Sequence, residues 1–365
     1  MKILTIVGAR PQFIKAATLS RLIQKRHDLC EIIVHTGQHF DENMSDVFFK
    51  QLDIPEPNYN LNIDSLSHGA MTGRMLEKVE SVMLREQPDW VVVYGDTNST
   101  LAGALAAAKL HLPLVHIEAG LRSNNLKMPE EINRVLTDRV SNLLLCPTEL
   151  AVQNLKNEGF PFKAPNNVEQ KIFNVGDVML DAVEYYRERV KAELDLTQFC
   201  LSKKSYVLCT LHRQENTDNP SRLRSIATAL LDIAETTPIV IPLHPRTKLK
   251  LQDLGISFSF GNIKLLEPLP YLEMQLLQMY AACILTDSGG MQKEAYFHGV
   301  PCITLRDETE WVETVAAGGN YLAGADRQNI VSAYERLRSS EVLTAALYGD
   351  GSAAQNIISL MLNSE

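Results

Sequence analysis

The chain has 365 residues, which is more than one hydrophobic core usually spans, so two domains are expected. Hydrophobic residues make up 45% of the chain and charged residues 22%, as is typical of a globular protein. The formal net charge of −9 argues against nucleic acid as a partner, because a polyphosphate backbone requires clustered basic residues.

Short apolar runs alternate with segments of helical periodicity in the first half of the chain. The predicted strands are residues 3–7, 32–35, 90–94, 114–117 and 143–146. The predicted helices are residues 14–25, 72–86, 99–110 and 150–157, and a further helix is expected to start at Pro129. Strands that are apolar throughout and separated by helices predict a parallel sheet buried on both faces.

The second half of the chain repeats this alternation. The predicted strands are residues 206–210, 239–243, 263–266, 283–286 and 302–305, and the predicted helices are residues 222–235, 272–281, 291–297 and 328–338. We therefore predict an α/β protein with two Rossmann-like, doubly wound parallel-sheet domains.

A polar segment separates the two halves. Residues 160–170 contain two prolines and two asparagines and predict a surface loop. We place the domain boundary after this loop, so that the first domain is residues 1–174 and the second is residues 175–350. Residues 351–365 are expected to form a last helix, for which packing against the first domain is one arrangement that the sequence allows.

No segment indicates secretion or a membrane span. The first apolar run ends at Val7, and the apolar stretch 101–115 is interrupted by Lys109 and His111. The six cysteines are scattered without a C-x-x-C pair or zinc-ligand spacing, as is typical of reduced thiols in a cytoplasmic protein. The expectation is therefore a cytoplasmic protein with neither a bound metal nor a membrane partner.

The turn after the first strand has features of a phosphate site. Residues 8–11 (GARP) lie at the carboxyl edge of the sheet, where doubly wound folds bind ligands. Gly8 permits close backbone approach, free N–H groups at the helix start attract an anion, and Arg10 adds a guanidinium group. Lys15 lies one helical turn further on. An ordinary βα turn with an exposed arginine is the alternative interpretation.

Acidic residues gather at the same predicted edge. Asp96 follows the strand at 90–94, Glu118 follows the strand at 114–117, and Glu130 and Glu131 fall in the first turn of the helix that Pro129 starts. Taken one at a time, each acid has a structural explanation: Asp96 can cap a helix, and Glu130 and Glu131 can interact favourably with the dipole at a helix N-terminus. Several carboxylates at one edge repel each other, which favours a shared chemical role.

The second predicted domain carries a matching set of residues. Residues 286–290 (TDSGG) follow a strand and open a helix, so Ser288, Gly289 and Gly290 can present N–H groups to a phosphate. Glu294, next on that helix, can accept the hydroxyls of a ribose. His212 and His244 each follow a strand and lie near an arginine. This pattern fits an anion site about as well as it fits a structural role.

Two common nucleotide fingerprints are missing. No G-x-G-x-x-G follows a strand, and there is no G-x-x-x-x-G-K-[ST] segment. Hydride transfer from a nicotinamide and ATP hydrolysis are therefore disfavoured, and no cofactor is expected.

Five segments together resemble the non-hydrolysing UDP-N-acetylglucosamine 2-epimerases. They are residues 8–15, 95–97, 116–122, 129–134 and 286–290, and the similarity runs from residue 1 to at least residue 307. The resemblance implies a glycosyltransferase-B-like fold with the active site in the interdomain cleft, and a homodimer. It implies interconversion of UDP-N-acetylglucosamine and UDP-N-acetylmannosamine by anti elimination of UDP and re-addition through a 2-acetamidoglycal, feeding surface polysaccharide synthesis.

The resemblance also implies roles for individual residues. The UDP moiety would be held by Arg10, His212, Ser288, Gly289, Gly290 and Glu294, with His212 beside the leaving diphosphate. The sugar would be surrounded, and its protons transferred, by Asp96, Glu118 and Glu130. Lys15 and Arg134 would lie near these acids, and His244 would contribute to substrate binding.

Other interpretations stay open at this point. The start of the chain is also similar to the branch that acts on UDP-2,3-diacetamido-2,3-dideoxyglucuronate, whose extra carboxylate would need a cation such as Arg122, Lys127 or Arg134. A UDP-sugar glycosyltransferase would share the expected fold and UDP site but need an acceptor groove. A non-catalytic UDP-sugar sensor would bind its ligand without exchanging the C2 proton. Residues 38–44 depart from the pattern of relatives that have a second, regulatory UDP-sugar site, so the resemblance does not extend to that regulation.

Overall fold

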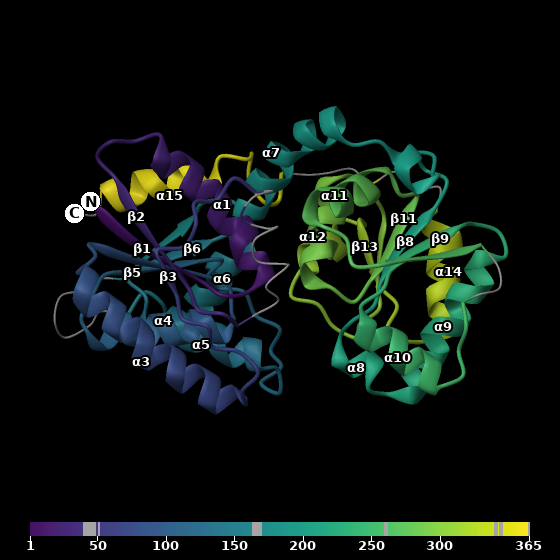
Figure 1. The fold of residues 1–365 in the computed structure, drawn as a ribbon, viewed down its shortest axis with the longest axis horizontal. Helices are drawn as coiled ribbons and strands as arrows, with labels where there is room; N and C mark the ends of the chain where they lie inside the picture. Colours follow the sequence, from purple (N-terminus) through teal and green to yellow (C-terminus); the bar gives the residue numbers. More distant parts are fainter. Residues whose placement is uncertain are drawn as a thin grey trace. The chain divides into compact units, whose positions relative to one another are not determined.

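The computed structural model describes residues 1–38, 49, 52–162, 170–258, 262–338, 342 and 346–363. The chain divides into two compact units. Unit 1 comprises Met1–Glu184 and Tyr348–Glu365, and unit 2 comprises Tyr185–Leu347. Each unit is built on its own parallel sheet with helices packed against it (Figure 1).

The sheet of unit 1 has seven parallel strands within the described residues. Their order is β3 (Tyr59–Asn60), β2 (Cys30–His35), β1 (Lys2–Val7), β4 (Trp90–Tyr94), β5 (Leu114–Ile117), β6 (Leu143–Cys146) and β7 (Lys171–Asn174). The strand order reverses between β1 and β4, which are neighbours in the sheet. The turns after β1, β4 and β5 therefore meet at one point of the carboxyl edge, where open α/β sheets bind ligands.

Helices cover both faces of this sheet. They are α1 (Arg10–Gln24), α3 (His68–Glu86), α4 (Asn98–Lys109), α5 (Pro129–Val140), α6 (Glu149–Asn157), the start of α7 (Val178–Glu193) and α15 (Ala353–Leu362). Figure 1 shows α15 alongside α1, and α3, α4 and α5 on the other side of the sheet. The core on that second side joins strand residues such as Ile6 and Val93 to Val79 of α3 and Ala104 of α4.

The sheet of unit 2 has six parallel strands in its described residues. Their order is β10 (Ile263–Leu266), β9 (Ile239–Pro242), β8 (Val207–Thr210), β11 (Cys283–Thr286), β12 (Cys302–Thr304) and β13 (Asn320–Leu322). The order reverses between β8 and β11, so the turns after these two strands adjoin. The predicted fold class, two doubly wound parallel sheets, is confirmed.

The helices of unit 2 form two layers. They are α8 (Gln214–Thr217), α9 (Pro220–Ala234), α10 (Pro245–Asp253), α11 (Tyr271–Tyr280), α12 (Gly289–Phe297), α13 (Val312–Ala316) and α14 (Arg327–Leu337), with a 3₁₀ turn at Leu196–Phe199. In Figure 1, α11 and α12 lie on one side of the sheet, and α9 and α14 pack together on the other. Leu230 of α9 and Ile330 of α14 belong to the core on the second side.

Most elements that the sequence analysis did not predict are short or polar, and the long helix α7 (Val178–Glu193) is the exception. Strands β7 and β13 lie at sheet edges and are partly exposed, so they lack a continuous apolar run. Helix α10 buries only Thr247 and Leu251, which leaves almost no apolar periodicity to detect. Helix α7 does bury Val178, Ala182 and Tyr186 at helical spacing, so its pattern was visible in the sequence.

The division between the units falls inside α7, whereas we placed the domain boundary after residue 174, just before this helix. The start of α7 belongs to unit 1 because Asp181 caps helix α15. Its carboxylate accepts hydrogen bonds from the backbone N–H groups of Ala353 (3.2 Å) and Ala354 (2.7 Å). Burial raises the pKa of Asp181 to about 6, against these backbone hydrogen bonds, which lower it.

Candidate functional site

The turn between β1 and α1 does not offer the free N–H groups that we expected. The side-chain carbonyl of Gln12 accepts hydrogen bonds from the backbone N–H groups of Gly8 (2.9 Å) and Ala9 (3.0 Å). A Cβ on Gly8 would lie 2.1 Å from both Ser99 Oγ and Thr36 Oγ1. The expectation of an open anion nest at these two groups is therefore wrong, and Gly8 is required by close packing within the protein.

The amide nitrogen of Gln12 connects this turn to the one after β4. Gln12 is 1% exposed, and its Nε2 donates to Tyr94 O (2.8 Å) and contacts Thr97 Oγ1 (3.0 Å) and Thr100 Oγ1 (2.9 Å). Thr97 caps α4 by accepting from the N–H of Thr100, so Asp96 is not the cap of this helix. The turn that carries Asp96 is thus anchored to the start of α1 by one buried side chain.

Glu118 and Lys15 form a buried ion pair at the same edge. The Lys15 ammonium contacts Glu118 Oε2, and both side chains are less than a tenth exposed. Glu118 has φ of 76°, in the left-handed region that is unfavourable for a residue other than glycine, and its N–H donates to Leu145 O (3.0 Å). A Cβ on Gly95 would lie 3.2 Å from Glu118 Oε2, so the glycine leaves room for this carboxylate.

Arg134 holds two acidic side chains. Its Nε donates to Asp96 Oδ2 (3.1 Å), and its Nη1 donates to Glu131 Oε2 (2.7 Å). Glu131 is 2% exposed and also accepts hydrogen bonds from the backbone N–H groups of Ser123 (3.0 Å) and Asn124 (2.9 Å). Glu131 is therefore committed to shaping the loop before α5.

Glu130 differs from its neighbour. It lies in the first turn of α5 and is half-buried, and it makes no hydrogen bond or ion pair within the described part of the chain. Arg10, the first residue of α1, is also half-buried. Ion pairs join Lys15 to Glu118, after β5, and Arg134 to Asp96, after β4, while Arg10 begins α1 and Glu130 lies in the first turn of α5.

Unit 2 has a buried carboxylate at its own carboxyl edge. Asp287 accepts hydrogen bonds from the backbone N–H groups of His212 (3.1 Å) and Arg213 (3.0 Å) and from Asn216 Nδ2 (3.2 Å). The ring of His212 lies 3.1 Å from the same carboxylate and is itself 54% exposed. Burial alone would raise the pKa of Asp287, but the hydrogen bonds and charge of His212 lower it below its usual value. Asp287 therefore orients an exposed imidazole.

The segment after Asp287 starts α12. Ser288 is its N-cap and accepts from the backbone N–H of Met291 (3.5 Å). A Cβ on Gly289 would lie 2.5 Å from Glu310 Oε1, whereas a Cβ on Gly290 would meet nothing within 4 Å. The N-terminus of α12 is therefore closed beside Gly289 and open beside Gly290, as a bound anion would require.

Two further predicted residues have protein partners. Glu294, one turn into α12, is 7% exposed and accepts from Gln278 Nε2 (2.8 Å). His244 caps α10, because its Nδ1 accepts from the backbone N–H of Arg246 (3.2 Å). Arg246 pairs with Asp218 (2.7 Å), so this histidine and arginine already have structural contacts.

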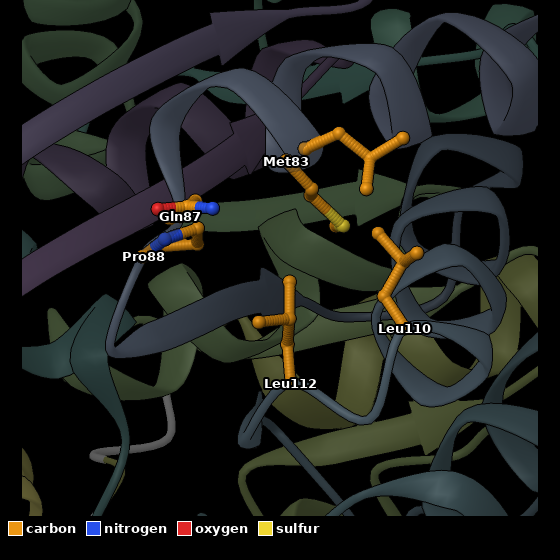
Figure 2. Close-up of a pocket in the computed structure, with 6 residues that line it drawn as sticks. Met83, Gln87, Pro88, Leu110 and Leu112 are labelled. Carbon is orange, nitrogen blue, oxygen red and sulfur yellow. The ribbon is translucent and has the colours of Figure 1, made fainter.

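A cavity of about 300 Å³ lies away from these residues, at the amino-terminal edge of the unit 1 sheet. Figure 2 shows that apolar side chains from the ends of α3 and α4 surround it. Its lining residues are Met83, Leu84, Gln87, Pro88, Leu110 and Leu112. It holds none of the acidic or cationic groups above.

Two structural features are absent from the described residues. No described helix combines the length and hydrophobicity that crossing a bilayer requires. In the same ranges, no three histidine, cysteine, aspartate or glutamate side chains gather as a metal ion would need. Residues 39–44, on which the comparison with regulated relatives rests, lie outside the described residues.

Comparison with known structures defines the class of protein. The crystal structure of Methanocaldococcus jannaschii UDP-GlcNAc 2-epimerase in complex with UDP-GlcNAc and UDP matches this chain with a TM-score of 0.91 and 42% identity, covering 100% of both chains. Both have a glycosyltransferase-B-like fold, in which each of two α/β domains is built on a parallel sheet.

Sequence comparison identifies the family within this class. Residues 21–362 match the family model of UDP-N-acetylglucosamine 2-epimerase. The UDP-2,3-diacetamido-2,3-dideoxy-D-glucuronate 2-epimerase of Pseudomonas aeruginosa is 54% identical over 359 residues, 98% of each chain. A UDP-N-acetylglucosamine 2-epimerase homolog of Methanococcus maripaludis is 49% identical over 368 residues, 100% of each chain. The chain belongs to the UDP-N-acetylglucosamine 2-epimerase family and is an epimerase of the isomerase class.

Proposed function

We propose that this protein inverts C2 of a UDP-linked 2-acetamido sugar by eliminating UDP and adding it back. The observation that carries the proposal is the set of three carboxylates, Asp96, Glu118 and Glu130, at the ligand-binding edge of unit 1 in a member of this family. Carboxylates at a sugar ring can both transfer protons and stabilise positive charge.

The chemistry of the sugar favours this route. C2 of a 2-acetamido sugar bears no acidic proton, because no carbonyl group is attached to that carbon. If the C1–O bond to UDP breaks as the C2 proton is removed, a 2-acetamidoglycal forms, and UDP can add back after a proton returns to the opposite face. The transition state resembles an oxocarbenium ion, which nearby negative charge stabilises.

The three acids differ in whether they have an ion-pair partner. Glu118 is held by Lys15 and Asp96 by Arg134, so both carboxylates have a cationic partner that fixes their positions. Glu130 has no ion-pair partner among the described residues, so it can take up and release a proton without breaking an ion pair. We assign Glu130 to proton exchange and the two paired acids to charge stabilisation and proton removal.

The nucleotide end of the substrate is assigned to unit 2. The N-terminus of α12, with Ser288, Gly289 and Gly290, suits the diphosphate, and Glu294 suits the ribose hydroxyls. His212 offers an imidazole whose orientation Asp287 sets, suited to the leaving diphosphate. On unit 1, Arg10 is the candidate cation for an anionic group of the substrate. His244 is retained as a weaker candidate for substrate binding, since capping α10 already occupies its Nδ1.

This assignment is tested by Gly290→Ala, because an added Cβ meets nothing in the free protein. The variant should keep the thermal stability of the free protein and lose the stabilisation that UDP gives the wild type. Gly69→Ala is the control, because its Cβ also meets nothing within 4 Å and Gly69 lies outside the proposed site. Equal stabilisation of wild type and Gly290→Ala by UDP would overturn the assignment.

Two substrates are candidates. The 54% identity to the P. aeruginosa enzyme favours UDP-2,3-diacetamido-2,3-dideoxyglucuronate. The 42% identity to the M. jannaschii enzyme, whose crystal structure contains UDP-GlcNAc, favours UDP-N-acetylglucosamine, the substrate that the resemblance in the sequence implies. We take the glucuronate as the first substrate to test and UDP-N-acetylglucosamine as the second.

The experiment that tests the function is turnover of each purified UDP-sugar without any acceptor. Proton NMR should show the C2 epimer of one sugar accumulating to equilibrium, and kcat/KM ratios decide between the two. A protein that needs an acceptor would be a transferase, and one that binds both sugars without epimerising either would be a sensor. Either outcome would contradict the proposal.

Two finer expectations rest on the resemblance alone. The epimerised UDP-sugar would feed surface polysaccharide synthesis, which loss of the polysaccharide on gene deletion would support. The assembly would be a homodimer, which sedimentation equilibrium tests directly. A monomer at micromolar concentration would contradict the second expectation and leave the reaction unchanged.

A further inference from the structure

His68 is an exposed side chain that a buried amide holds in place. It is the first residue of α3, and its Nδ1 lies 3.3 Å from Nδ2 of Asn98, the first residue of α4. Asn98 is 7% exposed, whereas His68 is exposed and has no second hydrogen-bond partner within the described ranges of the chain. The imidazole therefore lies beside the turn after β4, in which Asp96 precedes Asn98 by two residues.

The neighbouring hydrogen bonds fix which ring nitrogen carries the proton. The backbone carbonyl oxygen of Asp96 can only accept, so the atom of Asn133 that lies 2.9 Å from it is the amide nitrogen. The same nitrogen lies 3.3 Å from Oδ1 of Asn98, which accepts, so the amide nitrogen of Asn98 is the atom that faces His68. Nδ1 of His68 therefore accepts, and the ring proton lies on Nε2.

This chain of hydrogen bonds connects the ring to an acid of the proposed site. Asn133 is 5% exposed and precedes Arg134, whose Nε donates to the carboxylate of Asp96 (3.1 Å). Asp96 is thus held at its backbone by Asn133 and at its side chain by Arg134, and His68 belongs to the same hydrogen-bonded group. The N–H at Nε2 is therefore fixed relative to a carboxylate that the proposed function assigns to the sugar ring.

Nε2 of His68 has no structural task among the described residues. The N-cap of α3 is Ser67, and accepting from Asn98 uses Nδ1 alone. A ligand can therefore take the N–H of Nε2 without breaking a hydrogen bond of the free protein. A donor that is placed in advance in this way discriminates against ligands that lack the matching acceptor.

An uncharged carbonyl oxygen is the acceptor that suits this donor. The ring is neutral while Nδ1 accepts, and the cations Lys15 and Arg134 are already paired, the first with Glu118 and the second with Asp96 and Glu131. A carboxylate on the ligand is matched better by a cation than by a neutral N–H. Both candidate substrates carry at least one acetamido group, whose carbonyl oxygen is a neutral acceptor.

We propose that His68 is a specificity residue that contacts the substrate, and that its Nε2–H donates a hydrogen bond to the carbonyl oxygen of an acetamido group on the sugar. The identity of the ligand rests on the proposed function, whereas the position of the ring proton does not. The inference holds for either candidate substrate, because both carry the group in question.

Two substitutions separate contact with the ligand from contact with Asn98. In His68→Gln the side-chain amide reaches the position of Nε2, whereas in His68→Asn it reaches only the position of Nδ1. His68→Asn should raise the Kd of the UDP-acetamido sugar by roughly 3–10-fold, the scale of one lost neutral hydrogen bond, and His68→Gln should stay within about twofold of wild type. The Kd of UDP alone should not change in either variant. His27→Asn, at an exposed histidine between α1 and β2, is the control and should leave every Kd unchanged.

The choice of ligands identifies the acetamido group. Calorimetry compares UDP-N-acetylglucosamine, UDP-2,3-diacetamido-2,3-dideoxyglucuronate and UDP-glucuronate, which has the C6 carboxylate but no acetamido group. A loss of affinity for the first two sugars assigns the contact to the acetamido group at C2, and a loss for the second alone assigns it to the group at C3. UDP-glucuronate should bind wild type and His68→Asn equally.

Nitrogen NMR of protein labelled with ¹⁵N-histidine tests the ring directly, with the resonances assigned by their loss in His68→Gln. Near pH 8, Nδ1 of His68 should show the shift of an unprotonated nitrogen and Nε2 that of a protonated one. The Nε2 resonance should move on addition of the UDP-acetamido sugar and not on addition of UDP. A ring proton on Nδ1 would overturn the proposal.

The outcomes separate this inference from the proposed function. Equal affinity of wild type and His68→Asn for both UDP-acetamido sugars would overturn the inference. So would wild-type affinity in His68→Asn with weakened binding in His68→Gln, because the ring would then serve only Asn98, and so would an equal loss for UDP-glucuronate. The expected affinities in a protein that epimerises neither sugar would refute the proposed reaction and leave the contact standing. A wild type that binds neither UDP-acetamido sugar would refute both.

Discussion

Replacing Gln12 by methionine should destabilise unit 1 by several kcal/mol. Methionine keeps the length of the side chain but removes every polar atom, so the backbone N–H groups of Gly8 and Ala9 lose their acceptor. An unsatisfied buried donor costs roughly 1–3 kcal/mol, so the two together cost about 2–6 kcal/mol. The carbonyl of Tyr94 keeps Thr100 Oγ1 as a donor (2.7 Å), so it adds little to this loss.

The assay uses the distribution of tryptophan. The chain has two, Trp90 in unit 1 and Trp311 in unit 2. In a Trp311→Phe background, the fluorescence of Trp90, which is 6% exposed, follows the unfolding of unit 1 alone. A central loss of about 4 kcal/mol corresponds to a fall in Tm of roughly 8–16 °C for a unit of this size.

Gln153→Met is the matched control. Gln153 is exposed and hydrogen-bonds only to Asn157 (2.8 Å) within the described residues, so its loss should change stability by less than about 0.5 kcal/mol. If Gln12→Met loses less than about 1 kcal/mol, or no more than Gln153→Met, the buried network between the two turns is refuted.

Three further predictions concern single positions. Gly8→Ala should lower the free energy of unfolding by about 1–3 kcal/mol through overpacking. Gly73→Ala in α3, where the added Cβ meets nothing within 4 Å, should raise it by about 0.5–1 kcal/mol. Denaturant titrations in which both variants are as stable as the wild type would contradict both predictions. The pKa of Asp287 is lowered in the folded protein, so the ionised carboxylate adds its full contribution to the free energy of unfolding above about pH 4 and loses it as the pH falls further. Asp287→Asn should therefore lower the free energy of unfolding by about 3 kcal/mol at neutral pH and make its decrease in acid less steep. An unchanged dependence of stability on acid pH would refute this. Glu118→Gln should lower kcat by roughly 10²-fold or more with UDP affinity unchanged, measured by NMR turnover and calorimetry, and full activity would remove Glu118 from the site.

Much of the fold could be predicted because buried parallel strands leave a distinctive sequence pattern. The runs that became β1, β4, β5 and β11 are mostly apolar and almost wholly buried, since helices cover them on both faces. Once these strands were placed, the residues after them had to share the carboxyl edge. That reasoning located Asp96, Glu118 and Ser288 without any knowledge of side-chain contacts.

The contacts within the site could not be predicted in the same way. Gln12 is the third residue of helix α1, and the sequence shows only a polar residue near a helix start there. Its five partners come from two turns that are more than eighty residues apart in the sequence. The interpretation of Gly8 failed for this reason, because a glycine that admits a ligand and a glycine that admits Ser99 look alike in the sequence.

The buried contact between His116 Nδ1 and Asp138 Oδ1 (2.6 Å) was also missed, although each residue left a weak signal in the sequence. A histidine within the apolar strand Leu114–Ile117 must find a polar partner when buried. Asp138 follows Arg134 by four residues on α5, so the two share a face of that helix. The sequence offered no means of pairing these residues with each other across 22 positions.

The most direct test of the central claim is epimerisation in D2O, followed by proton NMR and mass measurement of the product. If C2 is inverted through loss and return of its proton, the product epimer carries deuterium at C2 after a single turnover. A product that is epimerised at C2 but retains protium there would contradict the account, and would assign the three carboxylates a different reaction.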